Sequence, residues 1–225
     1  MRLNSLLIYF LISFLFGCSD NKIHHDKDFI FGTLIDIKIY GESKIHAEKV
    51  SNEIFNEFHR LHKLLHPWEQ SLITDINNAI AKNKSIPIDN DEVISILIHA
   101  QYLETQTQTI FNPSIGKLIK LWGFHSNDHK QETIPIQKVI QKLVSSNPSM
   151  QSIQIKKGVL KSNNKDVQID LGGYAKGYAL DQAKKILANN NVENALINIG
   201  GNILAFGKHG ERDWVVGIQN PRKPN

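Results

Sequence analysis

The residues best placed for chemistry lie in one stretch, residues 170–181, which reads DLGGYAKGYALD. β-Branched residues precede it and a helical pattern follows, so Gly172, Gly173 and Lys176 fall near the start of a predicted helix. Glycine lets backbone N–H groups approach a ligand closely, and a helix N-terminus supplies unpaired donors and a partial positive charge. The stretch is therefore either a binding site for a phosphorylated ligand or a tight strand–helix turn. Its spacing matches neither a Rossmann glycine motif nor a P-loop.

Three histidines, His59, His62 and His66, lie near the end of a predicted amphipathic helix over residues 44–65. Their spacing brings them near one face of that helix, so a metal site is one interpretation. No acidic residue is spaced to complete such a site. Solvated or capping histidines are the alternative, which we favour.

The N-terminus has the pattern of an export signal. An apolar run over residues 6–16 follows a basic residue; it is too short to span a bilayer comfortably and has the length of a signal-peptide core. The run leads into Cys18 in a setting that resembles a bacterial lipobox. We predict a signal peptide over residues 1–17 and a lipid anchor on Cys18, which places the protein in the bacterial cell envelope, facing the periplasm. Ser19 disfavours inner-membrane retention, and the choice of membrane stays open.

Composition excludes several other classes. Cys18 is the only cysteine among 225 residues, so the stability of the fold cannot depend on an intramolecular disulfide. The net charge is +4, and the basic residues are scattered without interleaved aromatic residues, so we predict no nucleic-acid partner. No further segment is long and apolar enough to be a transmembrane helix.

Hydrophobic periodicity predicts an α+β fold rather than repeating βαβ units. A helix-rich first half is expected to pack on a mixed or antiparallel sheet built mainly from the second half. Residues 18–28 indicate a polar tether, and residues 29–225 a single domain. The predicted helices cover residues 44–65, 72–82, 91–107, 134–146 and 174–189. The predicted strands cover residues 29–40, 151–156, 158–162, 166–171, 195–199, 203–206 and 214–218.

Four short segments carry glycines, aromatic residues and polar groups in an informative order. They are residues 31–33, 111–124, 170–181 and 198–207, the last followed by Trp214. Each segment alone is weak evidence for a family. The ordered set, together with the lipobox, resembles the FAD:protein FMN transferase family, also called the ApbE family. The resemblance spans residues 29–221 and implies the ApbE-like fold.

The resemblance implies an exported, Mg²⁺-dependent enzyme that binds FAD, splits its pyrophosphate and transfers FMN to a threonine or serine hydroxyl, releasing AMP. The acceptor would be a flavoprotein subunit of a membrane redox complex. Phosphoryl transfer needs a metal ion and fixed donors around the diphosphate, and the glycine-rich stretch can supply the donors. Two alternatives remain: a lipid-anchored flavin-binding pseudoenzyme or carrier without catalysis, and a structural lipoprotein whose glycines only make turns.

The resemblance also implies roles for individual residues. The main-chain carbonyl of Ala175 would be a magnesium ligand, and Tyr178 would lie against the flavin nucleotide. The residues alone are equally consistent with core positions for Phe31 and Tyr178, with Trp68 capping the first helix, and with a turn at Asn112, which precedes a proline. The family's FAD-binding positions correspond to Phe31, Pro67, Trp68, Glu69, Asn112, Ala175 and Tyr178.

The family pattern continues beyond the segments found in this chain. A later segment of the family holds a catalytic histidine, and another holds an aspartate and a threonine that complete the magnesium site; neither occurs in these 225 residues. His125 and His129 lie in a predicted polar loop and do not fit that context, so we name no catalytic residue. We therefore expect these residues to be an incomplete domain that is poorly soluble and does not transfer FMN by itself.

Overall fold

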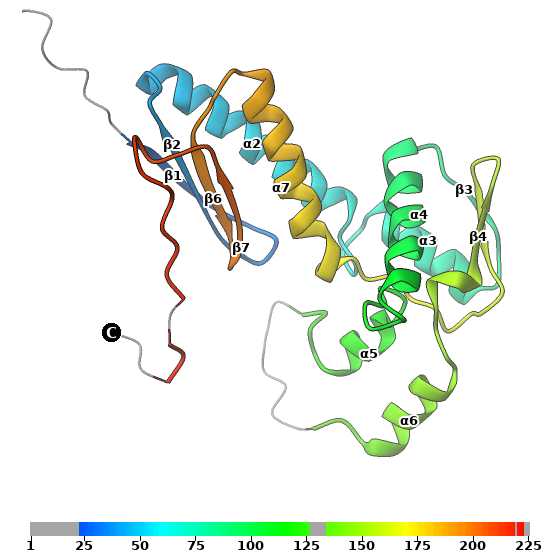
Figure 1. Cartoon of the computed structure of the whole chain (residues 1–225). Coiled ribbons are helices and arrows are strands. Elements are labelled where there is room, and N and C mark those ends of the chain that lie inside the picture. The colour runs from blue at the N-terminus through cyan, green and yellow to red at the C-terminus, as the bar shows by residue number, and fades with distance from the viewer. Residues whose placement is uncertain (1–22, 127–133, 219, 223–225) are drawn as a thin grey trace, which may run out of the picture.

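The computed structural model describes residues 23–126, 134–218 and 220–222 (Figure 1). The expected signal peptide and the acylation site at Cys18 lie outside the described residues. Within them the chain forms two lobes, one with a larger sheet and two long helices, the other with shorter helices and a small sheet (Figure 1). The α+β class predicted from the sequence is confirmed.

The larger sheet is antiparallel, and in the described part of the chain it has four strands in the order β1-β2-β6-β7. Alternate side chains of β2, at Ile35, Ile37 and Ile39, have no exposed surface, because a period of two puts them all on the inner face. Ile35 pairs with Ile199, so strands from opposite ends of the domain meet in the middle of the sheet. The strands are β1 (Ile23–Ile30), β2 (Thr33–Tyr40), β6 (Ala195–Ile199) and β7 (Asn202–Phe206).

Two long helices, α2 (Lys44–Leu64) and α7 (Gly172–Asn189), lie side by side and pack on this sheet (Figure 1). α2 begins where the Ser43 hydroxyl accepts a hydrogen bond from the N–H of His46, one of the groups that a helix start leaves unpaired. Burying one large apolar side chain contributes about 1.5–3 kcal/mol, so the apolar stripe holds α2 in place. The stripe follows the predicted spacing and includes Ala47, Val50, Ile54, Phe58 and Leu61.

The second lobe comes from the middle of the chain. Its helix α3 (Leu72–Ala81) begins with a capping box, in which the side chains of Ser71 and Thr74 each accept the backbone N–H of the other residue. A small antiparallel sheet in the order β3-β5-β4 lies beside α3 and α4 (Figure 1). The remaining elements are β3 (Ile86–Pro87), α4 (Asp91–Gln106), α5 (Gly116–Leu121), α6 (Gln137–Ser145), the 3₁₀-helix η2 (Met150–Ser152), β4 (Ile153–Lys156) and β5 (Val159–Ser162).

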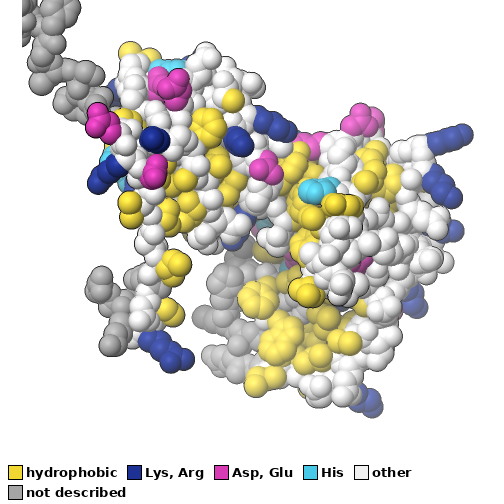
Figure 2. All heavy atoms as spheres, in the orientation of Figure 1, with side chains coloured by type: hydrophobic (Ala, Val, Ile, Leu, Met, Phe, Trp, Pro, Cys, Tyr) yellow, Lys and Arg dark blue, Asp and Glu magenta, His cyan; other side chains and the backbone are white. Residues whose placement is uncertain are grey.

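Hydrophobic side chains gather on the lower surface of the second lobe (Figure 2). Trp122 and Phe124, which follow α5, are exposed, as are Ile136 and Val144 at the two ends of α6. α6 itself contributes no buried residue. Among the described helices, none combines the length and the apolar character needed to cross a membrane.

The N-terminal strands differ from the prediction. Residues 23–28, expected as part of a tether, form most of β1, because β1 pairs with β2 along its whole length. Their polar alternation suits an edge strand, which keeps charged side chains in contact with water. The strand predicted over residues 29–40 is divided between β1 and β2 by a turn. The larger sheet therefore takes two of its four described strands from the start of the chain.

Two strands predicted in the C-terminal half also differ. Residues 166–171 do not join a sheet; Gln168 instead forms an isolated parallel bridge with Ile115, just before α5. Residues 214–218 form no strand in the described part of the chain. Trp214 stacks on His209, with ring centroids 5.0 Å apart, and its Nε1 donates a hydrogen bond to the carbonyl of Phe206.

Candidate functional site

A cavity of about 240 Å³ lies where the β1–β2 turn, the end of α2 and the start of α7 meet. Its walls come from three segments that are far apart in the sequence, residues 29–32, 61–69 and 170–176. Asn112 and Tyr178 are not among the lining residues. Five of the seven positions that the family resemblance connects with FAD do line the cavity, namely Phe31, Pro67, Trp68, Glu69 and Ala175.

Phe31 reaches the cavity because it occupies the turn between β1 and β2. Phe31 has φ 56° and Gly32 has φ 69°, a pair of left-handed residues that matches the right-handed twist of a two-residue hairpin. A left-handed conformation is unusual for a bulky residue. The Phe31 ring packs against Phe58 of the core at 6.1 Å and against His62 at 5.6 Å. Both interpretations of Phe31 therefore hold: it packs on the core and it lines the cavity.

Neighbouring rings continue from Phe31 along the wall. His62 contacts His66 with ring centroids 4.9 Å apart, and His66 contacts Trp68 at 4.5 Å. Burial lowers the pKa of both His62 and His66 below the ordinary value, because desolvation disfavours the imidazolium form. Both rings are therefore neutral at neutral pH. The wall is thus suited to a planar, uncharged ring system.

The three histidines do not come together as a set of metal ligands within the described residues. The Nε2 atom of His59 is hydrogen-bonded to Asp28 at 2.8 Å. His66 acts as a cap: its Nδ1 accepts the backbone N–H of Glu69 at 3.0 Å, which fixes the turn that carries Trp68. His66 is thus a capping histidine, one of the two roles favoured from the sequence.

The start of α7 forms the opposite wall and begins at Gly172, two residues earlier than predicted. The N-cap residue Leu171 makes no side-chain hydrogen bond to the helix. Instead, Oδ1 of Asp170 accepts a hydrogen bond from the N–H of Gly172 at 2.8 Å. Gly172 and Lys176 both line the cavity. A helix start with a glycine backbone and a lysine beside it suits a phosphate group.

The described residues do not make a magnesium site. Mg²⁺ in proteins normally takes one or two carboxylates together with phosphate and water oxygens. Within residues 23–126, 134–218 and 220–222, no group of three His, Cys, Asp or Glu side chains is placed to hold a metal ion. Ala175 lies one turn into α7, where a carbonyl accepts the N–H four residues further on. The metal-ligand role that the resemblance implies for Ala175 therefore stays a prediction for the complete protein.

Asn112 lies outside the cavity, in the turn that the residues alone suggested. Its amide donates a hydrogen bond to the carbonyl of Pro148 at 2.9 Å, and its Oδ1 accepts the N–H of Ser114 at 2.9 Å. Both ends of the side chain therefore hold the segment before α5 in place. The structure does not bring Asn112 together with the other candidate residues.

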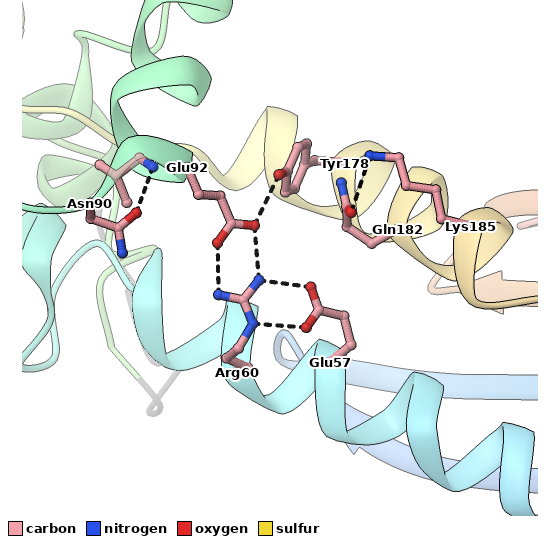
Figure 3. Close-up of polar contacts among 8 residues, drawn as sticks. Glu57, Arg60, Asn90, Glu92, Tyr178, Gln182 and Lys185 are labelled. Carbon is pink, nitrogen blue, oxygen red and sulfur yellow. Dashed lines mark hydrogen bonds and ion pairs between the residues drawn. The ribbon is translucent and has the colours of Figure 1, made fainter. Parts of the chain in front are cut away.

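Tyr178 does not line the cavity either, and it takes part in a polar cluster that joins three helices (Figure 3). Its hydroxyl donates a hydrogen bond to Glu92 of α4 at 2.9 Å, while Arg60 of α2 binds Glu92 through two nitrogens at 2.7 and 2.8 Å. Arg60 also makes two hydrogen bonds to Glu57. Burial, and then the hydrogen bond to Glu92, raise the pKa of Tyr178 well above its ordinary value. Tyr178 therefore connects the two lobes through Glu92.

Replacing Glu92 with glutamine is expected to lower the free energy of unfolding by about 0.5–1.5 kcal/mol at pH 7, a modest loss because the cluster is partly exposed. The hydrogen bonds from Arg60 lower the pKa of Glu92 below 4.5, so the folded state favours the carboxylate. The contribution is therefore present above that value and is lost as the pH falls through the folded-state pKa.

The stabilities of parent and Glu92→Gln in urea unfolding should accordingly differ at pH 7, and the difference should shrink as the pH falls below 4.5. The exposed Glu48→Gln on α2 is the matched control and should change stability little at either pH. A difference between parent and Glu92→Gln that is the same at both pH values would contradict the ionic role of Glu92.

Two polar residues, one lining the cavity and one behind its wall, were not named as site residues from the sequence. Asp170 marked the start of the glycine-rich stretch but was not named as a site residue, and it lines the cavity. His125, expected in a polar loop, has a side chain that is 1% exposed and pairs with Asp170. No local pattern around His125 signals its burial, because its partner is 45 positions away in the chain.

Comparison with known proteins shows the family to which the chain belongs. The family model described as the ApbE family matches residues 31–225. The FAD:protein FMN transferase of Rhodobacter capsulatus is 32% identical over 193 residues, which cover 86% of this chain and 36% of that protein. A protein of the same name from Klebsiella pneumoniae (strain 342) is 28% identical over 208 residues, covering 90% of this chain and 60% of that protein. The chain thus spans less than two thirds of either relative.

The fold has a close counterpart among solved structures. The crystal structure of the ApbE protein from Thermotoga maritima superposes with a TM-score of 0.80 at 28% identity, covering 91% of this chain and 65% of that one. Sequence and fold therefore indicate the same relationship over nearly the same residues. The chain belongs to the ApbE family.

Proposed function

We propose that the complete protein transfers FMN from FAD to a threonine or serine hydroxyl of an acceptor flavoprotein. The acceptor oxygen forms a bond to the flavin-side phosphorus, the pyrophosphate bridge breaks, and AMP leaves with the bridging oxygen. The observation that carries the proposal is the convergence of Phe31, Pro67, Trp68, Glu69 and Ala175, from three distant segments, on one cavity.

The described residues support the binding half of this reaction. Neutral aromatic rings on one wall suit the flavin ring system, and the glycine backbone and lysine at the start of α7 suit its phosphate. The Mg²⁺ dependence that the resemblance implies stays part of the proposal for the complete protein. Because the described residues lack a ligand set for Mg²⁺, we derive no step through that ion.

FAD affinity should depend on Gly173 and not on Gly177, four residues further along α7. A Cβ on Gly173 would meet Phe111 at 3.7 Å, an ordinary contact, so Gly173→Ala should fold normally. Gly173 does not itself line the cavity, but it follows Gly172, which does, in the first turn of α7. If the phosphate binds at this helix start, the added methyl group should hinder its approach, and we expect FAD to bind about tenfold more weakly, or about 1.4 kcal/mol. Gly177→Ala is the control, since it adds the same methyl group to the same helix at a position where a Cβ meets no described atom within 4 Å.

The measurements are FAD titration and FAD-dependent AMP release in the full-length protein, supplemented with Mg²⁺ and a threonine-bearing acceptor. FMN attached to the acceptor, with AMP formed in equal amount, supports the transferase. Tight FAD binding with no AMP would support the flavin-carrying alternative. Absence of FAD binding in the parent protein would overturn the proposal, and equal affinity of both glycine variants would overturn the phosphate seat at α7.

We further propose that the acceptor belongs to a membrane redox complex and that the protein is held at the periplasmic side of a bacterial membrane by a lipid on Cys18. The apolar core before that cysteine supports this location. Mass spectrometry of the mature N-terminal peptide should find Cys18 as the first residue, carrying acyl chains. An unmodified Cys18 would contradict the anchor, and Cys18→Ser should release the protein from the membrane fraction.

A further inference from the structure

His125 is a buried histidine for which the proposed function has no role. It lies in the segment after α5, and its Nε2 donates a hydrogen bond to Oδ2 of Asp170 at 2.7 Å. The two side chains are 1% and 6% exposed. The other oxygen of Asp170 accepts the N–H of Gly172. Both carboxylate oxygens are therefore held, one by the start of α7 and one by His125.

Trp68 lies against the same imidazole. The rings of Trp68 and His125 are stacked, with centroids 5.0 Å apart and planes inclined by 23°. Trp68 and Asp170 line the cavity, whereas His125 does not. Trp68 and Asp170 come from distant segments of the chain, and both contact the same His125 side chain.

The second nitrogen of the ring shows that packing alone does not explain a histidine here. Nδ1 of His125 is buried and has no hydrogen-bond partner among the described residues. A buried polar atom without a partner costs about 1–3 kcal/mol, a cost that an apolar side chain would avoid. The charge-assisted bond to Asp170 is the interaction that offsets it.

We propose that His125 is a positioning residue of this cavity, which orients Asp170 and Trp68 for binding of the flavin nucleotide. The inference rests on the proposed function, because FAD is the ligand. Without His125, Asp170 Oδ2 has no fixed partner, so the carboxylate can rotate away from Gly172. Trp68 at the same time loses the ring on which it stacks. The same residues still line the cavity, but the side chains of Asp170 and Trp68 are no longer held in one orientation.

The test is FAD titration of the full-length protein with substitutions at position 125. His125→Leu removes the donor at similar volume and should weaken FAD binding about tenfold or more. His125→Gln places an N–H₂ near the former Nε2 and should restore affinity to within about threefold of the parent. His46→Leu, on the surface of α2 where His46 pairs with Glu42, is the control and should bind as the parent does.

A double-mutant cycle with Asp170→Asn separates positioning from general destabilisation. If His125 acts through Asp170, His125→Leu should add little loss in the Asp170→Asn protein. Additive losses, or unchanged affinity of His125→Leu, would overturn the proposal. His125→Met takes the place of the leucine variant if that variant does not fold.

Tryptophan fluorescence measured without FAD distinguishes the positioning role of His125 from the proposed transferase function. In a full-length protein in which Trp122, Trp214 and any tryptophan beyond these 225 residues are replaced with phenylalanine, the remaining emission comes from Trp68, and His125→Leu should shift it in the absence of FAD. Unchanged emission would overturn the positioning role whatever the ligand is. If the parent binds no FAD but the emission shifts, the proposed function fails while the support of Trp68 by His125 stands.

Discussion

Replacing Asn77 with alanine is expected to lower the free energy of unfolding by about 2–4 kcal/mol, because it leaves two buried backbone groups without partners. The Asn77 amide donates to the carbonyl of Ile169 at 2.9 Å, and its Oδ1 accepts the N–H of Ile169 at 2.7 Å. Asn77 is 8% exposed and Ile169 is fully buried, so water cannot replace these bonds. Thermal unfolding should show a decrease in Tm of about 5–10 °C.

The neighbouring Asn78→Ala is the matched control, since Asn78 lies on the exposed side of the same helix, α3. It should change the Tm by less than about 2 °C. The Asn77 variant should also bind FAD more weakly below its Tm, because Ile169 precedes Asp170 and the cavity wall. Equal Tm values for the two variants would show that the Asn77 bonds contribute little.

Replacing Gly207 with alanine should destabilise the protein still more, by about 3–5 kcal/mol, through overlap and backbone strain together. Gly207 follows β7 with φ +60°, and a Cβ there would lie 1.9 Å from the carbonyl oxygen of Glu193. That oxygen belongs to the backbone before β6, so relief requires the strands to move apart. Gly207 therefore has a structural role in the motif over residues 198–207.

Gly201→Ala isolates the backbone part of this effect. Gly201 has φ +97°, and an added Cβ would find no atom of the described chain within 4 Å. It should cost about 1–2 kcal/mol, the strain of the left-handed region alone. Urea unfolding of both variants gives the difference, which is the cost of the overlap with Glu193. Equal losses would contradict the close approach at Gly207.

The helices could be predicted because each carries its own signals. Ser43 and Ser71 cap helix starts, and the stripe through Val50, Ile54 and Phe58 has the helical period. Such patterns depend on neighbours within one or two turns, so they are visible in the sequence. β1 could not be predicted in the same way, because its polar alternation becomes a strand only through pairing with β2.

The site was predictable as far as the family resemblance reaches. The family resemblance pointed to Phe31, Trp68 and Ala175, which line the cavity. It also pointed to Tyr178, whose hydroxyl donates a hydrogen bond to Glu92. The residues alone could not identify the pairing of His125 with Asp170, because a contact between distant segments leaves no periodic trace. The sequence therefore did not show which residue each polar side chain would contact in the folded protein.

The pairing of Ile35 with Ile199 has a consequence for the order in which the protein folds. Closing so long a loop costs chain entropy before its contacts are gained, so folding of the larger sheet should be slow and late during synthesis. Until β6 arrives, the hairpin of β1 and β2 presents an apolar face and an open edge to other chains. Because the cavity lies between this hairpin and α7, nascent chains that stop before β6 should have no FAD site and should need a chaperone to stay unaggregated.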